Sequence, residues 1–280
     1  MAAINLAEKY SKKVADKFYQ ESVIAGRTSK EYDFDGVKSI KVYTIVTQEP
    51  GDYTRSGTSR YGTPTDVEDT LQTLTITQDK SVSMVVDKGN NKQQELIKNA
   101  GKVLALELRE KFIPMVDKYA LDKWNAGRGA YTVKSAALTK NNIVEEIGKH
   151  ITLAGNNFVG IDDMSCYIGW TNFGYLVNAP EFLNLEKLGE KAVAKGKVGE
   201  VRGLSIVPVP DSYLPSGVEF LTVKKSSVLL PFQIKETKVH EDAPGISGAL
   251  MEIRYIYDAF VLDAKKEGVM ACLATTPTGA

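Results

Sequence analysis

Cysteine and histidine are scarce in this sequence of 280 residues, which contains two of each. Cys166 and Cys272 form no CxxC pair, so a disulfide framework and a structural zinc site both lack their residues. His150 lies in a predicted helix and His240 in a charged loop. For both, a surface position or a side chain hydrogen-bonded to nearby groups is favoured over catalysis. The sequence therefore predicts no metal site and no cofactor.

Catalytic motifs are absent as well. The sequence has no GxSxG elbow, no HExxH, no GxxxxGKS/T phosphate loop and no GxGxxG dinucleotide motif. The carboxylates of Asp162 and Asp163, and those of Glu145 and Glu146, are neighbours in sequence, and adjacent side chains usually point in different directions. Solvated surface is therefore favoured over an acid–base pair. No catalytic residue is predicted, and we expect a protein that is not an enzyme.

Neither sign of charge is in excess, with 35 Lys and Arg against 35 Asp and Glu. A protein that grips nucleic acid or an anionic membrane needs surplus basic residues, so this balance argues against both tasks. Lysines between residues 187 and 197 are interrupted by acidic residues, which favours a solvated helix face over a loose nucleic-acid contact. No apolar run approaches the roughly 20 residues that span a bilayer, and residues 1–10 carry no signal-peptide core. We expect synthesis in a reducing cytoplasm and no membrane partner.

An amphipathic helix is predicted near the N-terminus, ending at Gly26. Its apolar residues recur at steps of three and four, and they are Ala7, Tyr10, Val14 and Phe18. The stripe is narrow and a polar stretch follows it. The helix therefore needs a partner surface elsewhere in the fold or on another subunit, as an arm would.

Two long strands with an unusually long connection are predicted next. Residues 37–46 and 71–86 are rich in β-branched residues and partly alternate, and residues 47–66 between them contain Gly, Pro, Ser and Thr. A strand of ten residues reaches about 33 Å, so the pair can form a ribbon that leaves the body of the protein. Such a ribbon is not stable alone.

The connection carries aromatic and arginine side chains on an otherwise polar ribbon, which is a composition that protein–protein contacts favour. A mobile loop with incidental side chains is the alternative. The predicted contact residues at the tip are Tyr53, Arg55, Arg60, Tyr61 and Asp66.

A long helix is predicted over residues 93–124. Pro114 lacks a backbone N–H, so we expect a kink or break near Phe112. The predicted core face of this helix is formed by Leu96, Val103, Leu104 and Leu108.

After residue 129 the pattern changes to the short alternating elements of an α+β domain. Strands are predicted over residues 165–170, 204–209, 219–224, 227–234 and 251–262, and residues 268–274 close the structure.

The order of these parts resembles the tailed-bacteriophage major capsid proteins with the HK97-type fold. The resemblance covers nearly the whole chain. In the first half it rests on IVTQEPGDYTRSGTSRYGTPTDVEDTLQTLTITQDKSVSMVVD and on the helix end DKYALDKWNAG. In the second half it rests on CYIGWTNFGYLVNAPEFLNL, GKVGEVRGLSIVPVPDSYLP and MEIRYIYDAFVLDAKKEGVMACL.

The resemblance implies an HK97-like α+β fold and a division of the chain. The implied parts are an N-terminal arm (1–28), an extended β-hairpin E-loop with flanking strands (29–92), the spine helix of a peripheral domain (93–128), an axial α+β domain (129–239), peripheral-domain return strands (240–265) and a C-terminal strand and tail (266–280).

A function as a major capsid protein follows from the same resemblance. It implies pentamers and hexamers in an icosahedral shell that encloses double-stranded DNA without specific binding, in a virion whose subunits are made in the host bacterial cytoplasm. The arm and the loop tip would then contact other subunits. Because the arm pattern begins close to Met1, a separate scaffolding protein is implied rather than a cleaved segment, together with a portal protein.

Three other functions stay open. An encapsulin-type nanocompartment is similar in fold but encloses a cargo enzyme. A small-molecule enzyme on an α+β fold would retain activity as a monomer. A tail-tube protein is disfavoured because the long helix has no place in a mostly β ring.

Overall fold

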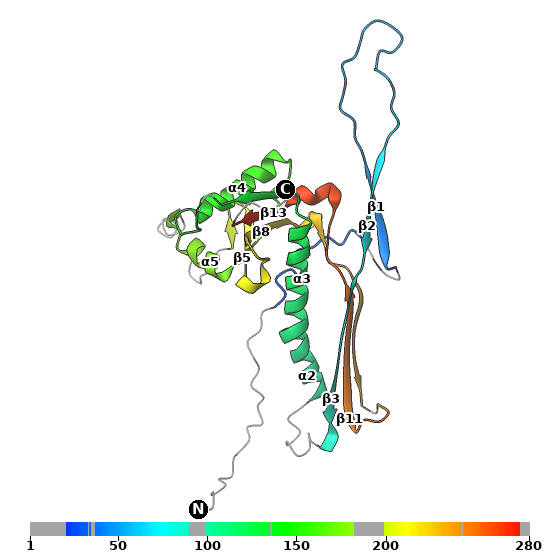
Figure 1. Ribbon diagram of the computed structural model, residues 1–280, viewed down its shortest axis with the longest axis vertical. Coiled ribbons are helices and arrows are strands. Elements are labelled where there is room, and N and C mark those ends of the chain that lie inside the picture. The colour runs from blue at the N-terminus through cyan, green and yellow to red at the C-terminus, as the bar shows by residue number, and fades with distance from the viewer. Residues whose placement is uncertain are drawn as a thin grey trace, which may run out of the picture.

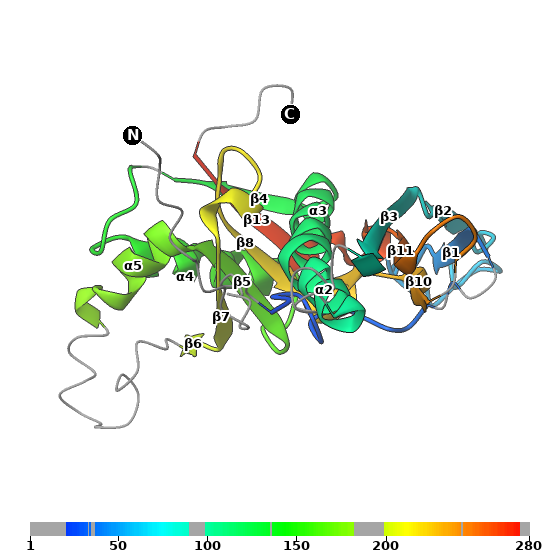
Figure 2. The same cartoon turned by 90° about the horizontal axis from the view of Figure 1, so that it is seen from below.

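Three parts make up the elongated subunit in the computed structural model (Figure 1). The structure describes residues 21–32, 34, 37–89, 99–134, 136–181, 199–241 and 243–274. A globular part lies to one side, a helix with a three-stranded sheet extends from it, and a two-stranded hairpin projects in the opposite direction (Figure 1). Seen from below, the helix separates the sheet of the globular part from β3, β10 and β11 (Figure 2). The predicted α+β class is confirmed.

The globular part is a six-stranded mixed sheet with an apolar layer on each face. Its strand order is β4-β13-β8-β5-β7-β6. Strand β5 (Met164–Gly169) is buried along its whole length because alternate side chains serve both layers. Ile168 packs with helices α4 and α5, and Tyr167 packs with α3. The other bounds are β4 Ala130–Val133, α4 Ile143–Asn156, α5 Trp170–Val177, β6 Glu200–Val201, β7 Leu204–Val209, η2 Asp211–Tyr213, β8 Val218–Lys224, η3 Lys225–Ser227, η4 Asp263–Gly268 and β13 Val269–Leu273.

Strand β13 lies inside this sheet, between β4 and β8. It is parallel to β4 and antiparallel to β8. The strand expected over residues 268–274 therefore joins the sheet of the globular part.

The long helix is irregular where the sequence predicts it. Helix α2 (Ala100–Glu107) continues into a π-helical run, η1 (Leu108–Phe112), and then into α3 (Ile113–Ala126). Pro114 stands at the start of α3. Since proline donates no backbone hydrogen bond, the regular ladder is interrupted in the preceding turn, and a π-helical run accommodates the gap.

The helix packs on a three-stranded antiparallel sheet with the order β10-β11-β3. These strands are β3 Gln78–Asp87, β10 Phe232–His240 and β11 Gly248–Tyr257. Phe112 and Val116 are buried against Ile253, Tyr255 and Tyr257 of β11. Of the predicted core face, Leu104 and Leu108 are half-buried in this cluster, Val103 is half-buried outside it, and Leu96 lies outside the described residues.

The projecting hairpin pairs β1 (Ser39–Ile45) with β2 (Asp69–Thr75). The prediction of one long strand over residues 71–86 is wrong. The chain leaves the hairpin after β2 and enters the three-stranded sheet as β3.

The buried carboxylate of Asp258 holds the chain in place at Thr77, between β2 and β3. Asp258 Oδ2 accepts hydrogen bonds from the Thr77 backbone N–H (2.8 Å) and hydroxyl (2.7 Å). Its other oxygen, Oδ1, accepts one from the hydroxyl of Tyr119 on α3 (2.8 Å). Asp258 therefore ties the base of the hairpin to the long helix.

Two strands lie in the three-stranded sheet because of their pairing. Strand β3 pairs with β11, so the two-stranded hairpin ends before Gln78. Strand β10 also pairs with β11, so it is not part of the six-stranded sheet of the globular part. The single strand expected over residues 227–234 is divided between β10 and β9 (Val228–Leu229), which pairs with β12 (Phe260–Val261).

Candidate interaction surfaces

The inner face of the hairpin is covered by its own chain at the base. Val42, Leu74 and Ile76 are buried together with Leu229 and Leu262 of the body. At the base of the hairpin this face is therefore covered by the same chain and needs no second copy.

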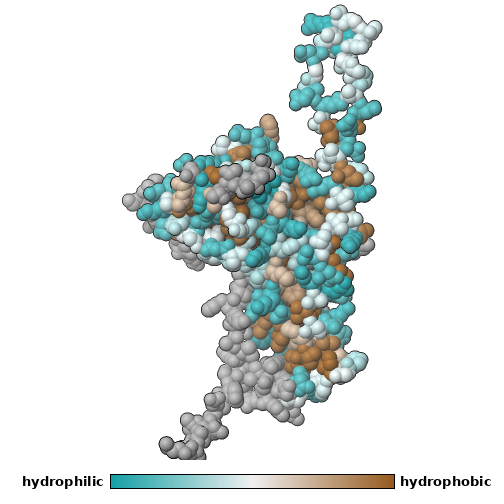
Figure 3. Space-filling model, viewed as in Figure 1, coloured by the Kyte–Doolittle hydropathy of each residue, from teal (hydrophilic) through white to brown (hydrophobic). Residues whose placement is uncertain are grey.

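The outer face of the hairpin is uncovered. Tyr43 lies directly opposite Leu71 across the strand pair, and Tyr43 and Ile45 are 64% and 68% exposed. Brown apolar atoms are visible on the stem of the hairpin in Figure 3. Burying a large apolar side chain stabilises by about 1.5–3 kcal/mol, so this face can contribute to a contact.

The loop beyond the strands ends in an ordered turn. The Thr54 N–H donates to the Arg60 carbonyl (3.0 Å), and Arg60 Nε donates to the Gly57 carbonyl (3.1 Å). The rings of Tyr53 and Tyr61 meet edge to face at 5.0 Å, and Tyr61 is 92% exposed. The predicted residues Tyr53, Arg60 and Tyr61 are thus brought together, and Arg55 and Asp66 are exposed elsewhere on the same loop.

The strap formed by residues 21–29 is held between the long helix and the six-stranded sheet. Asp117 of α3 accepts hydrogen bonds from the Ser22 hydroxyl and the Val23 N–H, both at 2.8 Å. Arg27 Nη1 donates to Ser165 Oγ (2.7 Å) at the start of the buried strand β5. The predicted arm contacts Tyr10, Val14 and Phe18, and the lysines between residues 187 and 197, lie outside the described residues.

Burial of Asp117, which is 1% exposed, raises the pKa of its carboxyl from the ordinary 3.8 to about 6, although Ser22 and Val23 act against the shift. The unfolded chain releases this proton near pH 3.8 and the folded protein near pH 6. The contribution of Asp117 to the free energy of unfolding is therefore greatest below pH 3.8, and it decreases as the pH rises to about 6.

Replacing Asp117 with Asn is expected to raise the free energy of unfolding by about 2 kcal/mol at neutral pH. An amide can still accept from the Val23 N–H and can donate to the Ser22 hydroxyl, while the buried charge is gone. Urea unfolding of both proteins at neutral pH and near pH 4 measures the effect. If Asp117→Asn were the less stable protein at neutral pH, the carboxylate would be a net stabilising group.

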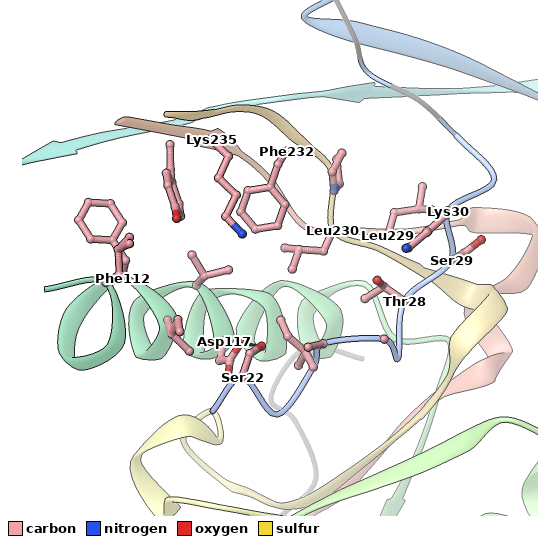
Figure 4. A pocket seen from close by; sticks show the side chains of 18 of the residues that line it. Ser22, Thr28, Ser29, Lys30, Phe112, Asp117, Leu229, Leu230, Phe232 and Lys235 are labelled. Carbon is pink, nitrogen blue, oxygen red and sulfur yellow. Dashed lines mark hydrogen bonds between the residues drawn. The ribbon is translucent and has the colours of Figure 1, made fainter. Parts of the chain in front are cut away.

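A groove of about 1010 Å³ opens beside the strap (Figure 4). Its floor is the helix, with Leu108 and Phe112, and one wall is formed by Phe232 and Lys235 of β10 and by Tyr255 of β11. Lys235 Nζ lies 5.6 Å from the ring centre of Phe232 and 5.7 Å from that of Tyr255. The groove therefore combines aromatic walls with cationic side chains.

Other chemistry is limited in the part of the chain that the structure describes. Residues of that part form no group of three His, Cys, Asp or Glu side chains that could hold a metal ion. Nor does it contain a helix long and apolar enough to cross a membrane. Both cysteines are buried, and burial raises the pKa of Cys166 to about 12 and that of Cys272 to about 11, so both are thiols at neutral pH.

Comparison with known proteins depends on structure alone, because no protein-family model and no curated protein matches the sequence. A structure of Mycobacterium phage Che8 aligns with a TM-score of 0.78 at 17% identity, covering 98% of this chain and 100% of that chain. The capsid structure of cyanophage P-SCSP1u aligns with a TM-score of 0.79 at 12% identity, covering 98% and 94%. The mature capsid of bacteriophage PhiM1 aligns with a TM-score of 0.77 at 13% identity, covering 97% and 93%. The chain has the fold of phage capsid proteins. The fold implied by the sequence resemblance is thereby confirmed.

The residues expected at a contact lie at the loop tip, and the uncovered outer face of the stem is a second candidate surface. The signal was present in residues 37–46, where apolar residues occupy both alternating sets. Ile40 and Val42 fall on the inner face and Tyr43 and Ile45 on the outer face. A strand that is apolar on both faces can pack on two surfaces, and here the body supplies one of them.

Proposed function

We propose that the chain is a major capsid protein whose copies assemble as pentamers and hexamers into an icosahedral shell around double-stranded DNA. The observation that carries the proposal is the hairpin, which projects from a subunit with a capsid fold and leaves its outer face and its aromatic tip uncovered. These surfaces can be buried on neighbouring copies, and closed symmetry satisfies every copy at once. Several small contacts per subunit act together through their effective concentration, so a shell of weak contacts is hard to dissociate.

The proposed function also assigns each part of the subunit to a part of a capsid protein. The strap with the residues before it is the N-terminal arm, and the hairpin up to Thr77 is the E-loop. The long helix with β3, β10 and β11 is the peripheral domain, and the six-stranded sheet with α4 and α5 is the axial domain. The near-zero net charge fits a shell that confines DNA without binding a particular sequence.

The remaining partners follow from the capsid role. A separate scaffolding protein and a portal protein would act during assembly, in the cytoplasm of a bacterial host, and the finished location would be the virion. An encapsulin-type compartment would use the same kind of contacts, but the similar solved structures are phage capsids, so this alternative is not favoured.

Electron microscopy of the purified protein, with and without its scaffold, tests the proposal. Closed shells are expected. Persistent monomers in both samples would refute it.

Replacing Leu71 with Asp tests the outer face of the stem. Since Leu71 is exposed, the free energy of unfolding should change by less than about 0.5 kcal/mol, while shell formation should be lost. Thr73→Asp is the matched control, because Thr73 is an exposed residue on the same face of the same strand. Shells that form equally well with both variants would show that this face contacts no neighbour.

A further inference from the structure

One carboxylate holds a lysine and an asparagine side by side in the globular part. Glu219 of β8 contacts Lys134 Nζ through Oε1, and its Oε2 accepts a hydrogen bond from Asn172 Nδ2 (2.9 Å). The backbone carbonyl of Glu219 accepts a second hydrogen bond from the same nitrogen (3.1 Å). Because both partners are acceptors, the nitrogen of the Asn172 carboxamide and not its oxygen faces Glu219.

The three side chains meet only in the folded chain. Lys134 directly follows β4, Glu219 lies in β8 and Asn172 in the first turn of α5, and β13 lies between β4 and β8 (Figure 2). The Lys134 N–H donates to the Leu273 carbonyl at the end of β13 (3.0 Å), so Lys134 reaches its place only when the last strand is inserted. Any reaction between Lys134 and Asn172 is therefore confined to the folded protein.

The contact is largely screened from water. The side chains of Lys134 and Glu219 are 19% and 20% exposed. Burial raises the pKa of the Glu219 carboxyl, but the hydrogen bonds from Lys134 and Asn172 and the charge of Lys134 outweigh it and hold the pKa below the ordinary 4.5. At neutral pH a carboxylate that can accept a proton therefore lies against an ammonium group that can give one.

We propose that Lys134 and Asn172 form an isopeptide bond within the chain, with Glu219 as the catalytic residue that carries the protons between them. The reaction occurs once per chain and uses no cofactor. It joins two parts of the globular domain of one copy, so it does not depend on the proposed shell function.

The atoms balance without a co-reactant. Glu219 Oε1 takes a proton from the Lys134 ammonium, and the freed lone pair of Nζ attacks Asn172 Cγ. A second proton then passes from Nζ through Glu219 to Nδ2, the Cγ–Nδ2 bond breaks, and the nitrogen leaves as ammonium. An Nζ–Cγ amide bond replaces the Cγ–Nδ2 bond, and Glu219 is a carboxylate again.

The geometry supplies the rate that this exchange lacks between free molecules. Reactive groups held together in a suitable orientation act at effective concentrations on the order of 10⁵ M or more. Here one carboxylate contacts the attacking nitrogen through one oxygen and the leaving nitrogen through the other. Glu219 is therefore placed to serve both proton transfers.

The bond ties the edge strand β4 to α5 across β13 and β8, and it closes a loop that contains α4. A closed loop restricts the unfolded chain, as a disulfide does. The modified subunit should therefore melt several degrees above the unmodified one.

Mass spectrometry of the full-length protein tests the proposal. Protein purified in urea and then refolded at neutral pH starts the reaction at a defined time. The intact chain should become lighter by the mass of one ammonia molecule and should remain a single chain in denaturing electrophoresis. A protease digest should contain a branched peptide in which Lys134 is joined to Asn172, which distinguishes the bond from loss of ammonia at another residue.

Three variants locate the chemistry. Glu219→Gln keeps the size of the side chain and should slow bond formation on the order of 100-fold or more, because the proton carrier is gone. Lys134→Arg should abolish the bond, because a guanidinium group stays protonated. Lys149→Arg is the matched control. Lys149 also contacts a buried glutamate, Glu146 (2.7 Å), but the second oxygen of that carboxylate has no hydrogen-bond partner among the described residues, so this variant should react at the natural rate.

The outcomes decide the proposal. Separate, unmodified Lys134 and Asn172 in the refolded natural protein overturn it and leave the capsid role intact. A 134–172 bond that forms in Glu219→Gln at the natural rate overturns the role of Glu219. If Glu219→Gln does not refold, the natural protein kept in urea replaces it. A bond that forms equally fast in urea overturns the proposal, because the reaction would then not depend on the folded site.

Discussion

Deleting residues 48–65 is expected to give a subunit that folds normally and forms no shell. The backbone hydrogen bonds of the deleted stretch, Thr54 to Arg60 and Gly62 to Ser59, stay within the loop itself. The strand pairs from Ser39–Thr75 to Ile45–Asp69 remain, and the five residues left to connect them suit a hairpin loop. The deletion removes the exposed tyrosine pair, which is the part of the loop best suited to hold a neighbour.

Thermal unfolding and electron microscopy measure the two halves of this prediction. The melting temperature should stay within a few degrees of that of the full chain, and particles should be absent. Tyr53→Ser with Tyr61→Ser, which keeps the length of the loop, should weaken assembly in the same direction. Normal particles from the deletion variant would show that the loop is dispensable.

A second large effect is expected on the stability of the fold when the pH is lowered, and it originates at His150. This side chain is fully buried in α4, with Nδ1 2.8 Å from the Thr222 hydroxyl and Nε2 2.9 Å from the Thr132 hydroxyl. Both ring nitrogens therefore have hydrogen-bond partners nearby, as the sequence analysis favoured. Burial lowers the pKa of His150 from 6.5 to about 3.

The sign of the effect follows from this direction. Between pH 6.5 and about 3 the unfolded chain binds a proton at this position and the folded protein does not. The contribution of His150 to stability is complete above pH 6.5 and falls as the pH decreases, by about 1.4 kcal/mol per pH unit and about 5 kcal/mol in all. Between pH 3.8 and 6, Asp117 changes the stability in the opposite direction. The pH dependences caused by Asp117 and His150 therefore partly cancel in the natural sequence.

Urea unfolding in the Asp117→Asn background separates the two groups. Asp117→Asn should lose stability steeply from pH 6.5 to 4, and adding His150→Gln should remove most of that slope, because glutamine cannot take up a proton. Parallel curves for the single and double variants would show that His150 does not control the acid response.

The types of the elements could be predicted from local pattern. The irregular turn in the long helix follows from Pro114, since one proline removes one backbone hydrogen bond whatever its surroundings. The alternation in residues 37–46 likewise predicts a strand before its partner is known.

Which strand pairs with which could not be predicted in the same way. Residues 71–86 have one continuous strand pattern, yet β2 pairs with β1 and β3 pairs with β11. The break at Thr77 depends on Asp258, whose position near Thr77 is created only by folding. Long-range partners of this kind leave no periodicity in the local sequence.

The candidate surfaces differ in the same way. Composition alone favours a contact at the tyrosines and arginines of the loop, because they stand in an otherwise polar stretch, and this stays a prediction. The groove could not be predicted, since its lining comes from the strap, the helix and two strands that are far apart in sequence.

The sequence by itself determined that this protein lacks the motifs of an enzyme, that it is α+β, and that it carries a long ribbon with aromatic and arginine side chains in its loop. Only the tertiary structure decided which face of the ribbon is covered by its own body, where the ribbon ends, and which groove the described residues form. The physical reason is that element type depends on side chains a few residues apart, whereas burial and exposure depend on surfaces that distant segments form together.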